Sequence, residues 1–154
     1  MKRFSIFFLV LLAINSCIKP PNYPVEPQIE FVSISDIAIG FQDSIDVVIS
    51  FTDGDGDIGW LEQDTASCDP CDGSCYEHPT IDLIIKRINS SCVIPSHLPY
   101  ITPKGKIDDI SGKITYNIAQ ILIFPDDTII YTFQIKDRAG HFSNIVQTPP
   151  ITFE

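Results

Sequence analysis

The sequence predicts an all-β domain of the two-sheet sandwich type, and three observations support this prediction. Short runs of Ile, Val, Phe, Tyr and Thr fill the chain from Ile29 onwards, separated by Gly, Pro, Asp and Asn, which is typical of strands joined by tight turns. No apolar pattern with a helical period lasts longer than about two turns. The 154 residues, 44% of them hydrophobic, are enough for one domain with its own core.

Several strands are expected in the last four fifths of the chain. The candidates are Ile29–Ile39, Ser44–Phe51, Ile81–Ile88, Lys113–Phe124, Thr128–Lys136 and Phe142–Phe153. The second alternates most clearly, because its odd positions from Ile45 to Phe51 are all apolar and would face a core. The segments 125–128 and 137–140 predict turns between the last three candidates. This spacing favours a two-sheet sandwich, with a small closed barrel as the alternative.

The first sixteen residues have the character of a signal peptide. Lys2 and Arg3 give a positive start, and the apolar stretch Phe4–Ile14 follows. A helix over that stretch would span about 16 Å, which is too short to cross a bilayer but fits the h-region of a signal peptide. No small-residue pattern marks an ordinary cleavage site. We therefore expect residues 1–16 to be removed in another way.

Residues Ile14-Asn15-Ser16-Cys17 resemble the lipobox of bacterial lipoproteins, although Asn15 stands where Ala, Ser or Thr is commoner. In that family the cysteine becomes the new N-terminus and carries diacylglycerol, so the resemblance implies lipidation at Cys17. The alternative is a plain secreted protein in which Cys17 is an ordinary thiol. Residues 18–28 hold four prolines, which predicts an extended tether over 17–28 and a domain over 29–154.

The charge excludes some classes of partner. Asp and Glu number 20 against 10 Lys and Arg, a formal net charge of −10. An acidic surface repels nucleic acid and does not dock on anionic lipid, so membrane attachment has to come from a covalent lipid or an apolar anchor. The chain has no nucleophile elbow, phosphate-binding glycine loop or zinc-protease motif, and its three histidines form no catalytic pattern. We therefore expect no enzyme.

An acidic loop is the clearest candidate site. Asp53, Asp55 and Asp57 alternate with glycines, and such a turn lets successive carboxylates converge on one point, as hard cations require. An EF-hand is rejected, because Ile58 stands where that loop needs glycine and no flanking helices are evident. The pattern predicts a Ca²⁺ site of weak, millimolar affinity. The alternative is a solvated turn in which Asp57 caps backbone N–H groups.

Topology adds a fourth ligand to the predicted site. If the strand before Asp53 is strand B of a sandwich and the turn at Asp137 joins F to G, both loops lie at the same pole. Asp137, with Asn144 as a further candidate, would then approach the acidic loop. The first strand begins at that pole, so the tether from Cys17 should arrive there as well.

Four cysteines remain beside Cys17: Cys68, Cys71, Cys75 and Cys92. An even number in an oxidising compartment predicts two disulfides with three possible pairings, and we expect Cys92 to reach back to the other three. The alternatives are a zinc site built from these thiolates, with His78 or His97 replacing one of them, and free thiols. Trp60, beside the acidic loop, is expected to pack at the core or its rim rather than to stack on sugar.

Two segments resemble a known group of proteins. Residues 51–59 (FTDGDGDIG) look like the acidic loop, and residues 133–144 (FQIKDRAGHFSN) like the last hairpin, of immunoglobulin-like domains in Bacteroidota lipoproteins. The resemblance implies an immunoglobulin-like sandwich and an outer-membrane lipoprotein on the periplasmic face or the cell surface. Residues 18–22 carry no acid; surface export in this group is linked to an acidic signal there, which favours the periplasmic face.

Two functions follow as hypotheses. The first is a non-catalytic binding or adhesion module of the cell envelope, with a protein or glycan partner and a calcium-stabilised pole. The second is an accessory or structural lipoprotein subunit of an envelope complex.

Overall fold

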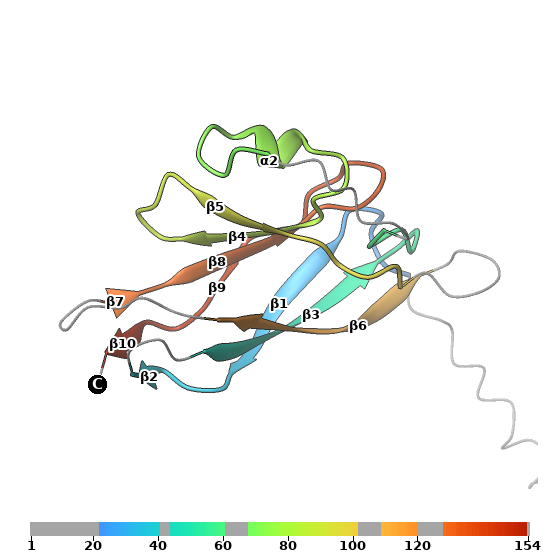
Figure 1. Cartoon of the computed structure of the whole chain (residues 1–154). Coiled ribbons are helices and arrows are strands. Elements are labelled where there is room, and N and C mark those ends of the chain that lie inside the picture. The colour runs from blue at the N-terminus through green and yellow to red at the C-terminus, as the bar shows by residue number, and fades with distance from the viewer. Residues whose placement is uncertain (1–21, 41–43, 61–67, 102–108, 120–127, 154) are drawn as a thin grey trace, which may run out of the picture.

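Two packed β-sheets form the body of the molecule, and a small third sheet closes one end (Figure 1). The computed structural model describes residues 22–40, 44–60, 68–101, 109–119 and 128–153. The predicted signal peptide, Cys17, the start of the tether and the predicted turn at 125–127 lie outside these described residues.

Each main sheet is antiparallel throughout. The first has the order β1-β3-β6 and contains β1 (Gln28–Ile34), β3 (Ile45–Asp53) and β6 (Ile110–Ile118). The second has the order β5-β4-β8-β9 and contains β4 (Leu83–Arg87), β5 (Val93–Ser96), β8 (Tyr131–Ile135) and β9 (Val146–Gln147). In the small sheet, β10 (Ile151–Phe153) lies between β2 (Ala38–Ile39) and β7 (Thr128–Ile129).

The predicted all-β sandwich is therefore confirmed. In the lettering of immunoglobulin-like domains, β1, β3 and β6 correspond to strands A, B and E, and β4, β8 and β9 to strands C, F and G. The strand before Asp53 is thus strand B, and the chain after β8 leads from F to G, as the sequence predicted. This order places the end of β3 and the end of β8 at the same pole.

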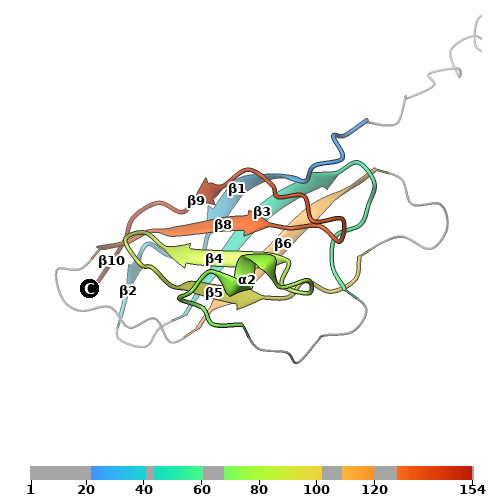
Figure 2. The same cartoon turned by 90° about the horizontal axis from the view of Figure 1, so that it is seen from above.

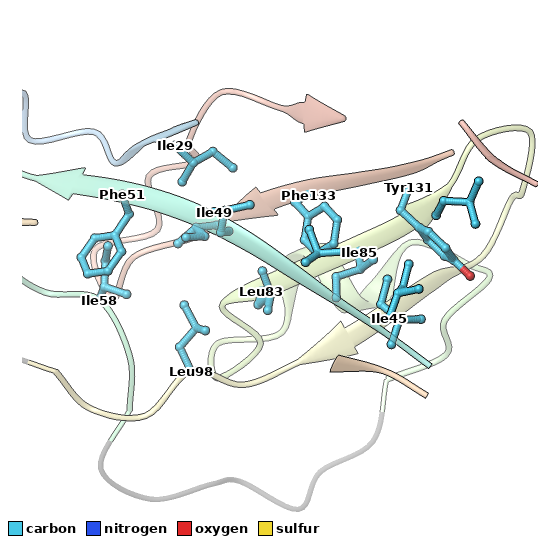
Figure 3. Close-up of a cluster of buried hydrophobic side chains, with 14 of the residues drawn as sticks. Ile29, Ile45, Ile49, Phe51, Ile58, Leu83, Ile85, Leu98, Tyr131 and Phe133 are labelled. Carbon is cyan, nitrogen blue, oxygen red and sulfur yellow. The ribbon is translucent and has the colours of Figure 1, made fainter. Parts of the chain in front are cut away.

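The core lies between the two sheets, and β3 supplies one wall of it (Figure 3). Ile45, Val47 and Ile49 are at most 1% exposed, as the alternation of the sequence predicted. From the opposite sheet, Leu83 and Phe133 join the same cluster. Each such side chain contributes about 1.5–3 kcal/mol when it is fully buried, so this wall holds the two sheets together.

Some predicted elements differ in the structure. The first candidate strand is interrupted, because the register with β3 shifts between Phe31 and Ser33 and pairing with β3 stops at Ile34. Strand β5 was not predicted; it contains Pro95, which is tolerated there because β5 lies at the edge of its sheet. A short helix, α2 (Ser74–Glu77), was also missed. Gln28, assigned to the tether, belongs to β1.

Two disulfides fasten the segment around α2. Cys68 is bonded to Cys75, and Cys71 to Cys92, so the predicted pair of disulfides is present and Cys92 does reach back. These bonds exclude a zinc site on the four thiolates as well as free thiols. Among the residues that the structure describes, a small apolar cluster lies beneath them, whose buried members are Cys75, Ile81, Ile84 and Val93. The crosslinks therefore stabilise a segment that has little core of its own.

Replacing both Cys71 and Cys92 with serine is expected to lower the free energy of unfolding by about 3 kcal/mol, through the entropy that the unfolded chain regains. The bond spans a sequence separation of 21 residues, so its loss frees a substantial loop. Urea denaturation of the oxidised proteins measures the difference, which should shrink when both proteins are reduced. Equal midpoints for the oxidised wild-type and variant proteins would contradict the prediction.

A candidate cation site at the acidic pole

Four aspartates meet at one pole of the sandwich, called the acidic pole below. Asp53 is the last residue of β3, and Asp137 follows β8 by two residues. One carboxylate oxygen from each of Asp53, Asp55, Asp57 and Asp137 lies within 4.8 Å of the others. Figure 2 shows the two loops side by side at the right-hand end of the molecule. The convergence predicted from spacing and topology is confirmed, and the four carboxylates could hold a metal ion.

The acidic loop is held in shape by its own residues. Gly56 and Gly59 have φ angles of 65° and 82°, a left-handed conformation that glycine adopts without strain. The backbone N–H of Asp57 donates to Oδ2 of Asp53 at 2.8 Å, which turns the chain back on itself. The alternation with glycine therefore works as the sequence suggested, by allowing the side chains to face one point.

The turn after β8 is bonded to this loop. The N–H of Arg138 donates to the carbonyl of Asp57 at 3.2 Å, and the N–H of Ala139 donates to Oδ2 of Asp57 at 3.0 Å. Asp57 thus caps backbone N–H groups, as the alternative interpretation of the loop proposed, while also belonging to the cluster. The two loops form one unit, although 80 residues separate them in sequence.

Arg138 fixes the far side of the acidic loop. Its guanidinium group donates to the carbonyl oxygens of Ile58 and Gly59, at 3.3 and 2.7 Å, and lies 4.7 Å from the ring centroid of Tyr100. Its charge also acts on the nearby carboxylate of Asp57. The acidic loop therefore holds Arg138 in place, and the positive charge of Arg138 offsets part of the negative charge of that loop.

His141 is a second group at the pole that the sequence did not single out. Its backbone N–H donates to Oδ1 of Asp137 at 2.7 Å, and its ring Nδ1 lies 2.8 Å from Oδ2 of the same carboxylate. The hydrogen bond with Asp137 raises the pKa of the His141 imidazole. The only sequence signal for this contact is the spacing of four residues across a turn that contains Gly140.

The carboxylates of the pole are buried without enough partners. Asp53 and Asp137 are 0% and 1% exposed. Oδ1 of Asp53, Asp55 and Asp57 is buried and accepts no hydrogen bond from the described residues. Burial, together with repulsion from the neighbouring carboxylates, raises the pKa of Asp53 to about 7, and burial raises the pKa of Asp57 as well. Buried charges of one sign are costly unless they are paired or bind a metal.

Without a cation, the folded protein is expected to become less stable between about pH 4 and pH 7 through Asp53. The folded state keeps this proton up to about pH 7, whereas the unfolded chain releases it near 3.8. The folded state therefore binds more protons in this window, so the free energy of unfolding falls as the pH rises. Thermal melts in chelator check this: the Asp53→Asn variant should lack this part of the slope, and an unchanged slope would contradict it.

Asn144, the further candidate ligand, has another role. Its Oδ1 accepts from the N–H of Ile29, and its Nδ2 donates to the carbonyl of Ile29, both at 2.8 Å. The side chain thereby pairs with β1 like a short piece of strand, and both of its polar atoms are used. Trp60 is partly buried, and its backbone N–H donates to the carbonyl of Leu98 at 3.3 Å. Its indole Nε1 is buried and has no hydrogen-bond partner among the described residues.

Asp82 and Lys136 are two further buried charged residues, outside the cluster of four aspartates. Asp82 is fully buried, and burial raises its pKa to about 6; its Oδ1 accepts from the N–H of Leu98 at 2.7 Å. Lys136 donates to the carbonyls of Tyr76 and His78. The contacts of Lys136, which directly follows β8, tie the disulfide-bonded segment to the end of that strand. Within the described residues, the acidic pole alone gathers three or more residues able to ligate a metal.

Comparison with known proteins adds no relative: no protein-family description matches the chain, and no curated sequence is similar to it. The interpretation of the acidic pole therefore depends on its own geometry. Among the residues that the structure describes, no helix has the length and apolar character to cross a membrane.

Proposed function

We propose that this protein is a lipid-anchored, non-catalytic binding or adhesion module of the cell envelope, and that its acidic pole binds Ca²⁺. One observation carries the calcium proposal. Oδ1 of Asp53 is fully buried, accepts no hydrogen bond from the described residues, and belongs to a group of four converging carboxylates. A bound cation would remove the cost of this arrangement, which the surrounding protein groups offset only in part.

Size and chemistry favour calcium over other divalent ions. Calcium lies about 2.3–2.6 Å from its oxygen ligands, so one ion reaches oxygens up to about 4.6–5.2 Å apart. The carboxylate oxygens here lie within 4.8 Å of one another. Magnesium binds at about 2.0–2.1 Å in a strict octahedron, and zinc prefers nitrogen and sulfur ligands. The all-oxygen set suits Ca²⁺ best.

The proposed anchor gives the domain an orientation. Residues 22–27 run along the acidic pole, where the carbonyl of Pro24 accepts from the N–H of Gly54 at 2.8 Å. A lipid on Cys17 would therefore keep this pole towards the membrane. The opposite end, with β2, β7 and β10, would point away from the bilayer (Figure 1). Two or more acyl chains would make the attachment stable.

A role as a subunit of an envelope complex is the second candidate, and one observation favours it. Phe142 and Ile145, which both lie between the turn at 137–140 and β9, are 40% and 60% exposed. Exposed apolar side chains of this size are available for contact with another protein. A pull-down from detergent-solubilised membranes distinguishes the two functions: a stoichiometric partner supports the complex, and binding of glycan or matrix by the purified protein supports the adhesion module.

Calorimetric titration of the full-length protein with Ca²⁺ tests the calcium proposal. We expect one site with a Kd of about 10⁻⁴–10⁻³ M, as in other extracellular modules. Asp55→Asn removes one ligand charge and should weaken binding about tenfold or more, a loss of about 1.4 kcal/mol or more.

Asp36→Asn is the matched control for this titration. Oδ1 of Asp36 accepts from the N–H groups of Ile37 and Ala38, contacts that asparagine keeps, and Asp36 lies outside the cluster. This variant should bind calcium like the wild-type protein. Absence of both heat and a melting-temperature shift in the wild-type protein would remove calcium from the proposal.

A further inference from the structure

We infer that the cation site is also a clasp for the N-terminal segment, so that binding of Ca²⁺ fastens residues 22–27 to the domain. The inference depends on the proposed calcium site and adds to it a mechanical role. Its starting point is Gly54, which lies between two of the predicted ligands, Asp53 and Asp55, and whose N–H donates to the carbonyl of Pro24 at 2.8 Å. The backbone that carries the ligands therefore holds the segment directly.

Gly54 is suited to this contact by its lack of a side chain. A Cβ atom at this position would collide with the carbonyl oxygens of both Tyr23 and Pro24. The requirement for glycine here comes from the close approach of the segment and not from the backbone conformation, because the positive φ angles of this loop are those of Gly56 and Gly59. The glycine-rich sequence of the loop thus serves the segment as well as the cation.

Further contacts hold the same segment. The N–H of Tyr23 donates to Oδ1 of Asp109 at 3.3 Å, just before β6 begins. Glu26 is close enough to His141, in the turn after β8, for its charge to act on the imidazole. Pro27 is buried. The segment is therefore fixed to β6 on one side, to the acidic loop in the middle, and to the interior just before β1.

The cation would couple these contacts through the position of Gly54. Without an ion, four converging carboxylates repel one another and push apart the loop that carries Gly54. A bound ion draws the same carboxylates together and sets the direction of the N–H between them. Coupling of this kind is reciprocal. If calcium strengthens docking of the segment by a given factor, docking of the segment strengthens calcium binding by the same factor.

Amide hydrogen exchange, followed by NMR in the full-length protein in detergent, measures the clasp directly. Saturating Ca²⁺ should slow exchange at Gly54 and Tyr23 by a factor of about 5–150 relative to chelator, the usual range of coupling between sites. The N–H of Ser90, which donates to the carbonyl of Arg87 at 3.0 Å in the β4–β5 hairpin, is the control. The rate at which the Ser90 amide exchanges through local opening should be the same with Ca²⁺ and with chelator.

Three variants test the reciprocal effect by calorimetry. Gly54→Ala keeps all four carboxylates but prevents docking, so it should weaken calcium binding by about the factor by which calcium slows exchange. Asp109→Ala removes the acceptor of Tyr23 and should also weaken binding. Asp109→Asn removes the same charge but keeps an acceptor oxygen, so it should bind calcium more tightly than Asp109→Ala.

The outcomes separate the clasp from the calcium site itself. If calcium binds with measurable heat but leaves exchange at Gly54 and Tyr23 unchanged, the clasp is wrong and the calcium site stands. Equal affinities for Asp109→Ala and Asp109→Asn would also contradict the clasp, since charge alone would then explain the effect. If no calcium binds, the proposed function fails together with the clasp.

Discussion

In the absence of calcium, the Asp53→Asn variant is expected to be more stable than the wild-type protein at about pH 8, above the raised pKa of about 7 that Asp53 has in the folded state. The wild-type residue must then keep a buried negative charge next to three other carboxylates. Asparagine removes that charge and keeps an oxygen that can accept from the N–H of Asp57, as Oδ2 of Asp53 does. The variant therefore avoids the electrostatic cost without losing the contact that shapes the loop.

Calcium should reverse the order of the two proteins. Binding to the folded state alone stabilises it by about 2.7 kcal/mol when the free ion is at 100 times its Kd, and the wild-type protein should gain this whereas Asp53→Asn gains little. Melting temperatures with chelator and with calcium measure both effects. Asp36→Asn, with its charge loss outside the cluster, should follow the wild-type protein. A variant that is less stable than the wild-type protein in chelator would show that ionised Asp53 does not strain the fold.

Replacing Cys17 with alanine is expected to abolish membrane retention. In the proposed function, acyl chains on the Cys17 thiol supply the membrane attachment. The net charge of −10 disfavours adsorption to anionic lipid as a substitute for them. Fractionation of cells that produce the variant should find unprocessed precursor or released protein in place of a membrane-bound mature form.

Asn15→Ala is the matched control for that experiment. It changes the neighbouring sequence by one residue and moves it towards the commoner lipobox pattern, so it should be processed and retained like the wild-type protein. If Cys17→Ala is instead processed and retained as before, the protein is not anchored through this residue. The orientation proposed for the acidic pole would then lose its basis.

The sandwich could be predicted because its central strand is encoded locally. In β3, the alternation from Ile45 to Phe51 specifies which face is buried, and the structure keeps that pattern. The edges were harder to predict. Strand β5 contains Pro95, which is allowed there because β5 lies at an edge, and the shift between Phe31 and Ser33 depends on the partner strand.

Some residues of the candidate site could likewise be predicted from the sequence, and others could not. Asp53, Asp55 and Asp57 could be found from their spacing with glycine, and Asp137 from the pole at which a B strand and an F–G turn meet. Asn144 was placed at the right end but with the wrong role, because its pairing with Ile29 joins residues 115 apart. No pattern of residues along the chain encodes such a contact.

The roles of Arg138 and Gly54 were missed for a related reason. Each acts on backbone atoms of a distant segment: Arg138 on the carbonyls of Ile58 and Gly59, and Gly54 on the carbonyl of Pro24. Backbone carbonyls have no sequence signature, so these contacts become visible only when the chain is folded. A glycine required by close approach is also indistinguishable in sequence from one required by a turn.

The central claim is that the acidic pole is a calcium site, and a crystal structure of the protein grown with Ca²⁺ tests it most directly. Anomalous scattering should locate one ion among the four carboxylates, about 2.3–2.6 Å from an oxygen of each, including the buried Oδ1 of Asp53. Water or a neighbouring side chain at that position, with calcium present at many times millimolar concentration, would contradict the claim.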